Sequence, residues 1–152
     1  MVLSVSNLDH PSCSLAFRLA PSEPFAMLYT HSIYDAPVAE IFEAHSGEIL
    51  LKSVRTDSPA VVEYYGFEGS APLQDLNLNL GPTVTVQVGM TQEQRLAIGG
   101  KTIDLRTLAD PGDRIRLNLK DVSLPSYLLW SLVGQGPLPA PVNDSRQEKR
   151  AP

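Results

Sequence analysis

The sequence predicts a mainly β protein: an antiparallel β-sandwich or partly closed barrel of about eight strands with a short C-terminal helix. Charged residues make up only 19% of the chain and proline occurs 13 times, which favours sheet and turns over long helices. Short stretches of alternating apolar and polar residues recur along the chain, separated by turn residues. A length of 152 residues suits one domain with its own core.

The composition also restricts the classes of partner. The chain has 12 basic and 17 acidic residues, with no basic stripe before its last few residues, so we expect no nucleic-acid binding. Cys13 is the only cysteine, which excludes an intrachain disulfide, and its place beside an apolar stretch predicts a buried thiol. Residues 1–12 carry no export signal, so either the protein is cytoplasmic, which the sequence itself favours, or that segment is missing from this chain.

The first strands are expected before residue 21. Residues 1–6 predict a short edge strand, and the polar residues 7–12, which include a proline, predict a turn. Residues 14–20 alternate, with three apolar side chains on one face, and therefore predict a second strand.

A three-stranded meander is expected over residues 25–56. The first arm is Phe25 to Ser32 and the return arm is Val38 to Ala44, with a five-residue loop, Ile33 to Pro37, between them. The proline belongs at the start of the return arm because it cannot donate to a β-ladder. A Ser-Gly turn then leads into the alternating residues 48–56.

The second half of the chain predicts further strands. Asp57 to Gly66 is less regular, and its two valines and two tyrosines predict a short strand whose tyrosines suit a binding surface or a sheet edge. Leu76, Leu78 and Leu80 alternate with asparagines, as in a half-buried strand or an extended ligand-facing segment. The remaining expected elements are a strand over residues 83–89, a hairpin of residues 95–105 that turns at Gly99-Gly100, a helical turn over residues 106–109 capped by Asp104, and a last core strand over residues 114–120.

The C-terminal region differs in composition. Leu124 to Val133 is strongly apolar but too short to span a bilayer, which takes about 20 residues. Pro125 near its start and Gly134 after its end predict a short helix that packs on the sheet, with an interfacial membrane or partner contact as the alternative. We therefore expect one β-rich domain over residues 1–134 and a disordered Pro-rich, charged tail over residues 135–152.

A group of polar residues at the tip of the first hairpin is the candidate site. In the expected hairpin His31 and Glu40 are near neighbours across the strands, with Ser32 and Asp35 close by in the loop. A carboxylate beside an imidazole raises the imidazole pKa and can orient the ring. We expect a polar notch, supported by Tyr29, in which His31 donates a charge-assisted hydrogen bond to a carboxylate ligand or a partner loop.

Three alternatives remain for the same residues. In the first, they only bond the loop backbone and fix the shape of the hairpin. In the second, an enzyme uses His31 as base, Glu40 as its orienting group and Ser32 as nucleophile. No Gly-x-Ser-x-Gly elbow is present and neighbouring strand residues point to opposite faces, so we assign no catalytic residue and favour a non-enzymatic role. In the third, His31, Glu40 and Asp35 bind a metal, although no spacing requires it, and we expect neither metal nor cofactor.

The same stretch contains the run Tyr29-Thr30-His31-Ser32, followed by Pro37-Val38 and by Glu40. This pattern resembles the signature of the DUF1850 family, a bacterial and archaeal domain of unknown function. Ala36 stands where a threonine is usual in the family, which removes that hydroxyl from any role here. The family's order of a Gly-Gly turn, an Asp-Leu segment and a Pro-Gly turn follows over residues 96–119.

The resemblance covers residues 13–120 and implies a role without a known reaction. Members of the family are associated with TRAP transporters of the TAXI type, and many carry an N-terminal membrane or export segment. The resemblance therefore implies an accessory protein near the cell envelope, whereas the sequence itself favours the cytoplasm. The resemblance also implies TRAP-TAXI transporter components as partners, whereas the residues of the polar notch predict a small carboxylate ligand as the alternative.

Overall fold

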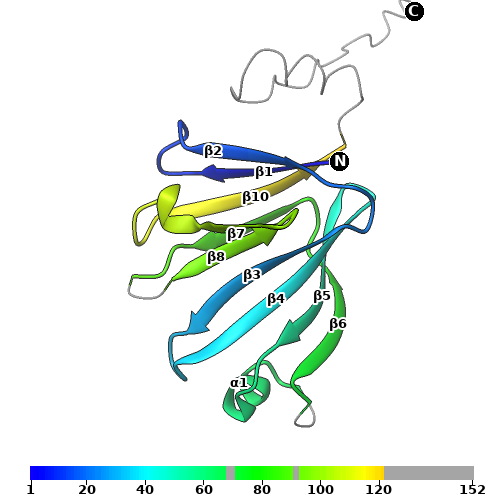
Figure 1. The fold of residues 1–152 in the computed structure, drawn as a ribbon, viewed down its shortest axis with the longest axis vertical. Coiled ribbons are helices and arrows are strands. Elements are labelled where there is room, and N and C mark those ends of the chain that lie inside the picture. Colours follow the sequence, from blue (N-terminus) through cyan, green and yellow to red (C-terminus); the bar gives the residue numbers. More distant parts are fainter. Residues whose placement is uncertain (68–70, 91–92, 122–152) are drawn as a thin grey trace, which may run out of the picture.

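The computed structural model describes residues 1–67, 71–90 and 93–121. This part of the chain forms two antiparallel sheets of four and six strands, one α-helix and one 3₁₀ turn (Figure 1). The predicted mainly β fold is confirmed, and of the two predicted forms, sandwich or partly closed barrel, the described residues show two separate sheets. They form ten strands, where about eight were expected. The elements are β1 (Val2–Asn7), β2 (Ser14–Arg18), β3 (Pro24–His31), β4 (Ala36–His45), β5 (Glu48–Arg55), α1 (Pro59–Tyr64), β6 (Leu73–Asn79), β7 (Thr83–Gln87), β8 (Gln94–Ile98), β9 (Lys101–Asp104), the 3₁₀ turn η1 (Leu105–Thr107) and β10 (Arg114–Lys120).

The four-stranded sheet has the order β2-β1-β10-β7. The prediction that residues 1–6 form an edge strand is wrong, because β1 pairs with β2 on one side and with β10 on the other. Val2, Leu3 and Val5 are all buried, which suits a strand inside a sheet and not at its margin. The strand on the second side of β1 is β10, which comes from the far end of the described chain. The sequence around β1 therefore does not indicate this pairing.

The six-stranded sheet has the order β6-β5-β4-β3-β8-β9. Its centre is the predicted meander β3-β4-β5, which is confirmed. Strand β8 pairs with the free side of β3, so the hairpin that carries the candidate site lies inside the sheet. The register of β5 shifts between Leu51 and Ser53, where a β-bulge adds to the bend and twist of the strand.

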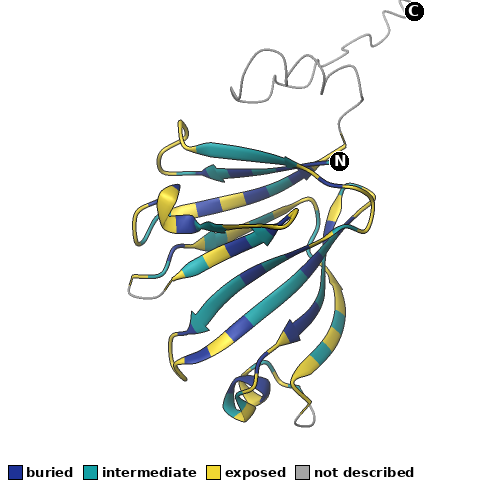
Figure 2. Cartoon of the chain, viewed as in Figure 1, coloured by how far each residue is buried: buried dark blue, intermediate teal, exposed yellow. Residues whose placement is uncertain are grey.

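Two groups of buried side chains hold the molecule together. The larger one consists of buried residues from both sheets and therefore lies between them; Figure 2 marks the buried positions in dark blue. The smaller one contains Ala36, Val38, Val54 and Val61 and lies at the end of the six-stranded sheet beneath α1. Figure 1 shows that α1 lies at the end of this sheet that is remote from the four-stranded sheet. The helix therefore covers a part of the six-stranded sheet that the other sheet leaves open.

The prediction of a short strand within residues 57–66 is wrong, because α1 occupies this segment. Ser58 is the N-cap, and its hydroxyl oxygen accepts a hydrogen bond from the backbone N–H of Val61. Pro59 follows at the first helical position, where its fixed φ and missing N–H are tolerated. Val61 and Val62 are buried, and Val61 packs in the smaller cluster against side chains of β4 and β5.

The other elements agree with the sequence, with two exceptions. The strands β7 and β10, the β8–β9 hairpin with Gly99-Gly100 at its turn, and the helical turn capped by Asp104 are confirmed. The strand expected around Leu76 to Leu80 is present as β6, but it begins at Leu73 and is mostly exposed instead of half-buried. The Asp104 carboxylate accepts a hydrogen bond from the Arg106 backbone N–H at 2.9 Å. The expectation of a buried thiol at Cys13 is wrong, because this residue lies in the turn before β2 and is exposed.

The predicted C-terminal helix and the predicted disordered tail over residues 135–152 lie outside the described residues. Within residues 1–67, 71–90 and 93–121, no helix has both the length and the apolar composition needed to cross a bilayer.

Candidate functional site

The register of the β3–β4 hairpin decides which residues meet. His31 lies opposite Ala36, and Glu40 lies opposite Met27. Tyr29 lies between Met27 and His31 on β3. Its side chain points to the same inner face as theirs, because alternate residues of a strand share a face. His31 and Glu40 are thus four residues apart along the strand, about 13 Å. The prediction that these two side chains are near neighbours is wrong.

The carboxylate of Glu40 binds two tyrosine hydroxyls instead. The hydroxyl of Tyr29 donates a hydrogen bond to Glu40 Oε1 at 3.0 Å, and the hydroxyl of Tyr65 donates to the same oxygen at 3.0 Å. The two hydroxyls also contact each other. Three oxygens therefore share two protons. We call Glu40, Tyr29 and Tyr65 the Glu40 triad.

The Glu40 triad joins the helix region to the sheet. Tyr65 is the C-cap residue of α1, whereas Tyr29 and Glu40 come from adjacent strands. Tyr29 packs against both hydrophobic clusters, and Tyr65 packs against the smaller one. The triad is therefore a polar connection between the main core and the cluster beneath α1.

The surroundings of the triad change the acidity of both tyrosines. Burial is the main cause that raises the pKa of Tyr65 to about 12, and the negative charge of Glu40 adds to this effect. Burial likewise raises the pKa of Tyr29 well above its usual range, with further contributions from the hydrogen bond to Tyr65 and the charge of Glu40. Both hydroxyls thus remain protonated donors at neutral pH.

These raised pKa values predict a loss of stability in alkali. An unfolded tyrosine has a pKa near 10, so between about pH 10 and about pH 12 the unfolded chain releases protons that the folded chain retains. The free energy of unfolding should therefore fall as the pH rises through this interval, by up to about 1.4 kcal/mol per pH unit for each tyrosine. Urea unfolding at a series of alkaline pH values should show a shallower slope for the double variant Tyr29→Phe/Tyr65→Phe. Equal slopes for the two proteins would contradict the shifts.

His31 lies in a different environment from the one expected. It is buried, and its Nδ1 accepts a hydrogen bond from the backbone N–H of Ile33 at 3.3 Å. In the neutral ring this bond leaves the proton on Nε2. The backbone of Ile33, and not Glu40, therefore favours one tautomer. The His31 ring lies against two tyrosines, with centroid distances of 5.1 Å to Tyr34 and 4.8 Å to Tyr64.

Ser32 and Asp35 both lie exposed in the loop between the strands. Asp35 has a left-handed backbone conformation (φ 47°), and its N–H donates to the carbonyl of His31 at 2.9 Å, which closes the turn. Aspartate is one of the few residue types that tolerate this conformation. The described hydrogen bonds include none among the side chains of His31, Ser32 and Glu40.

An exposed aromatic surface surrounds the tip of the hairpin. The exposed fractions are 67% for Ile33, 42% for Tyr34 and 59% for Tyr64. The rings of Tyr34 and Tyr64 are 6.2 Å apart, and both contact His31. We call Ile33, Tyr34, Tyr64 and His31 the aromatic end of the sheet.

Packing behind the surface supports the aromatic end. The ring of Tyr64 contacts that of Tyr65 edge-on at 5.8 Å, and Tyr65 in turn stacks on Phe67 at 5.8 Å. Sequence reasoning noted the paired tyrosines but did not place them beside the hairpin. The Ser58-Pro59 pair is a helix-start signal that could have predicted α1. In a helix, Tyr64 and Tyr65 point in different directions and therefore contact different neighbours.

The residues considered for a metal site are not brought together. Among the described residues, the one group whose ligand atoms all lie within 4.8 Å of one another consists of His10, Asp110 and Asp113, far from the hairpin tip in sequence. The Asp113 carboxylate already accepts a hydrogen bond from the side-chain amide of Asn7 at 2.9 Å. This group therefore forms part of the contact between two turns.

The fold and the site define the chain as a mainly β protein of two packed sheets with a surface-exposed aromatic end. No family model matches the chain, and no curated protein or solved structure matches it.

Proposed function

We propose that this chain is a non-enzymatic binding domain and that the aromatic end is its contact surface for a partner protein. The observation that carries the proposal is the grouping of Ile33, Tyr34 and Tyr64, three exposed large side chains, around one buried histidine. Protein interfaces are enriched in tyrosine, which contributes a large apolar area and a hydroxyl at low cost in conformational entropy.

The support beneath the surface favours binding. The Glu40 triad and the stack of Tyr65 on Phe67 fix the position of α1 beside the hairpin, and α1 in turn holds Tyr64 against His31. A surface that is already ordered loses less conformational entropy when a partner binds. Ser32 and Asp35 lie in the exposed loop, where they suit polar contacts at the rim of such an interface.

The side chains that the enzyme hypothesis requires already form other hydrogen bonds. Glu40, the proposed orienting group, accepts hydrogen bonds from two tyrosines, and Nδ1 of His31 accepts a backbone N–H. The geometry therefore favours binding over a reaction that uses His31, Ser32 and Glu40. The further proposal that the partner is a component of a TRAP transporter of the TAXI type rests on the resemblance to DUF1850 proteins alone.

A capture experiment with matched variants tests the proposal. The wild-type chain and the double variant Tyr34→Ser/Tyr64→Ser are immobilised, and proteins from a detergent extract of the native cells are quantified on each. We expect at least a tenfold loss of the specifically captured partner in the variant, because aromatic residues near the centre of an interface dominate its binding energy. The control is Leu73→Ser/Leu78→Ser on β6, which removes two side chains that are 49% and 52% exposed.

Capture that is equal for the wild type and the tyrosine variant would refute the aromatic end as the contact surface. Loss with both double variants would indicate a general effect of surface apolarity and would also count against it. Circular dichroism and thermal unfolding must first show that all three proteins fold alike. If the partner is lost specifically but is no transporter component, the binding domain stands and the TRAP-TAXI assignment fails.

A further inference from the structure

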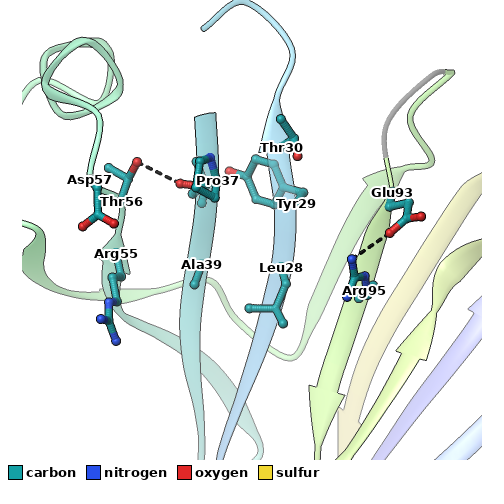
Figure 3. Close-up of a pocket in the computed structure, with 11 residues that line it drawn as sticks. Leu28, Tyr29, Thr30, Pro37, Ala39, Arg55, Thr56, Asp57, Glu93 and Arg95 are labelled. Carbon is teal, nitrogen blue, oxygen red and sulfur yellow. Dashed lines mark hydrogen bonds and ion pairs between the residues drawn. The ribbon is translucent and has the colours of Figure 1, made fainter. Parts of the chain in front are cut away.

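The opposite face of the same hairpin carries a groove. It lies on the outer face of the six-stranded sheet, has a volume of about 460 Å³, and crosses strands β5, β4, β3 and β8 (Figure 3). This volume is within the range of small-molecule sites in proteins. The residues that line it are Leu28, Tyr29, Thr30, Pro37, Val38, Ala39, Arg55, Thr56, Asp57, Glu93 and Arg95. We call it the arginine groove.

The register explains why two arginines flank this groove. Arg55 lies opposite Ala39, Ala39 lies opposite Leu28, and Leu28 lies opposite Arg95. These four residues thus form one row across four strands, with an arginine at each side and two apolar residues between them (Figure 3). Three strand spacings separate the arginine backbones, about 14 Å, so both long side chains border the same floor.

The two arginines differ in their charge environment. The guanidinium of Arg95 forms an ion pair with Glu93 at 2.7 Å. The side chain of Arg55 has no hydrogen-bond or ion-pair partner within the described part of the chain, although Asp57 lines the same groove. The charge of Arg55 is therefore available to an incoming anion, whereas Arg95 and Glu93 together offer both donors and acceptors.

The floor between the arginines is unusually apolar for an outer face. One face of an antiparallel sheet commonly carries polar side chains toward water. Here Leu28, Ala39 and Pro37 line the floor, and Thr30 adds one hydroxyl. Leu28 and Ala39 are only partly exposed, and the small side chain of Ala39 leaves room above the strand. A flat apolar body could therefore rest on this floor.

We infer that the arginine groove binds a small organic carboxylate with an apolar body. Its carboxylate pairs with the guanidinium of Arg55, and its apolar body covers Leu28, Ala39 and Pro37. Arginine suits this role because its planar fork can donate two parallel hydrogen bonds to one carboxylate. The site is separate from the aromatic end, which lies on the inner side of the hairpin tip, so the inference does not depend on the proposed function.

Binding of simple aromatic and aliphatic carboxylates tests the inference. Benzoate, phenylpropionate and hexanoate are titrated into the full chain, and backbone amide shifts are followed by NMR, with the corresponding neutral amides as matched ligands. We expect saturable binding of at least one carboxylate, with shifts confined to β3, β4, β5 and β8, and at least tenfold weaker binding of its amide. The variant Arg55→Gln should weaken carboxylate binding by about tenfold or more.

Two further variants separate the groove from general electrostatics. Arg116→Gln removes an exposed arginine from β10 of the other sheet and should leave the affinity unchanged. Ala39→Leu fills the floor without changing any charge and should abolish binding. The inference is overturned if none of the three carboxylates binds, if carboxylate and amide bind equally, or if Arg55→Gln binds as tightly as Arg116→Gln.

Discussion

Replacement of Glu40 by alanine should lower the free energy of unfolding by about 2 kcal/mol. The substitution removes the acceptor that the hydroxyls of Tyr29 and Tyr65 share at 3.0 Å. A hydrogen bond to a charged group contributes about 1.5–3 kcal/mol, and a donor left unsatisfied away from water costs about as much. Both tyrosines are half-buried, so water can reach them in part and the lower half of this range applies.

Two substitutions resolve the cause of that loss. Glu40→Gln keeps an acceptor oxygen but removes the charge, and should cost roughly half as much. Glu43→Gln, three positions along the same strand, breaks only a partly exposed ion pair with Lys52 and should cost less than about 1 kcal/mol. Urea unfolding of the three variants provides the comparison. Similar losses of unfolding free energy for the Glu40 and Glu43 variants would show that the Glu40 triad contributes no more to stability than a surface ion pair.

The effect of Glu40→Ala should also appear at α1. Because Tyr65 joins this helix to the sheet, loss of the triad should increase amide hydrogen exchange in α1 more than in the meander. The proposed contact surface should then weaken as well, since α1 holds Tyr64 beside His31. Stability and partner capture would thus decline together in this variant, whereas Tyr34→Ser/Tyr64→Ser should affect mainly the capture.

The sequence predicted the strands well because their signal is local. Alternation with period two and Gly-containing turns identified the meander of residues 25–56, the β8–β9 hairpin and the last core strand. The helix was missed because Val61, Val62 and the tyrosines fit either period over so short a stretch. The interior place of β1 was missed because its partner β10 lies more than 100 residues away.

The sequence identified three residues of the candidate site but not which of them are in contact. The length of the loop explains the difference. The sequence singled out Tyr29, His31 and Glu40, which all lie on the inner face of the hairpin. A five-residue loop would have placed Glu40 opposite Thr30, whereas the observed turn over residues 32–35 places it opposite Met27. The left-handed Asp35 allows this shorter turn. Small differences in loop length thus decide which side chains meet across a hairpin.

Loss of the Asn7 side chain should destabilise the protein more than any other polar substitution considered. Asn7 is only 1% exposed, and its side-chain amide makes four hydrogen bonds. The nitrogen donates to the Leu108 carbonyl at 3.1 Å and to Asp113 Oδ2 at 2.9 Å. The oxygen accepts the backbone N–H groups of Asp9 at 2.8 Å and His10 at 3.0 Å. One buried amide therefore joins the β1–β2 turn to the segment before β10.

We expect Asn7→Ala to lower the free energy of unfolding by about 3 kcal/mol, because it leaves several buried or half-buried groups without a partner. Asn7→Asp keeps the acceptor but brings a second carboxylate beside Asp113, so it should cost at least as much at neutral pH. The control Asn118→Ala removes one exposed hydrogen bond with Thr83 and should cost less than about 1 kcal/mol. Chemical unfolding decides between these values. A cost for Asn7→Ala no larger than that for Asn118→Ala would mean that other contacts hold the two turns together, such as the pairing of β1 with β10 and the ion pair of Asp9 with Arg114.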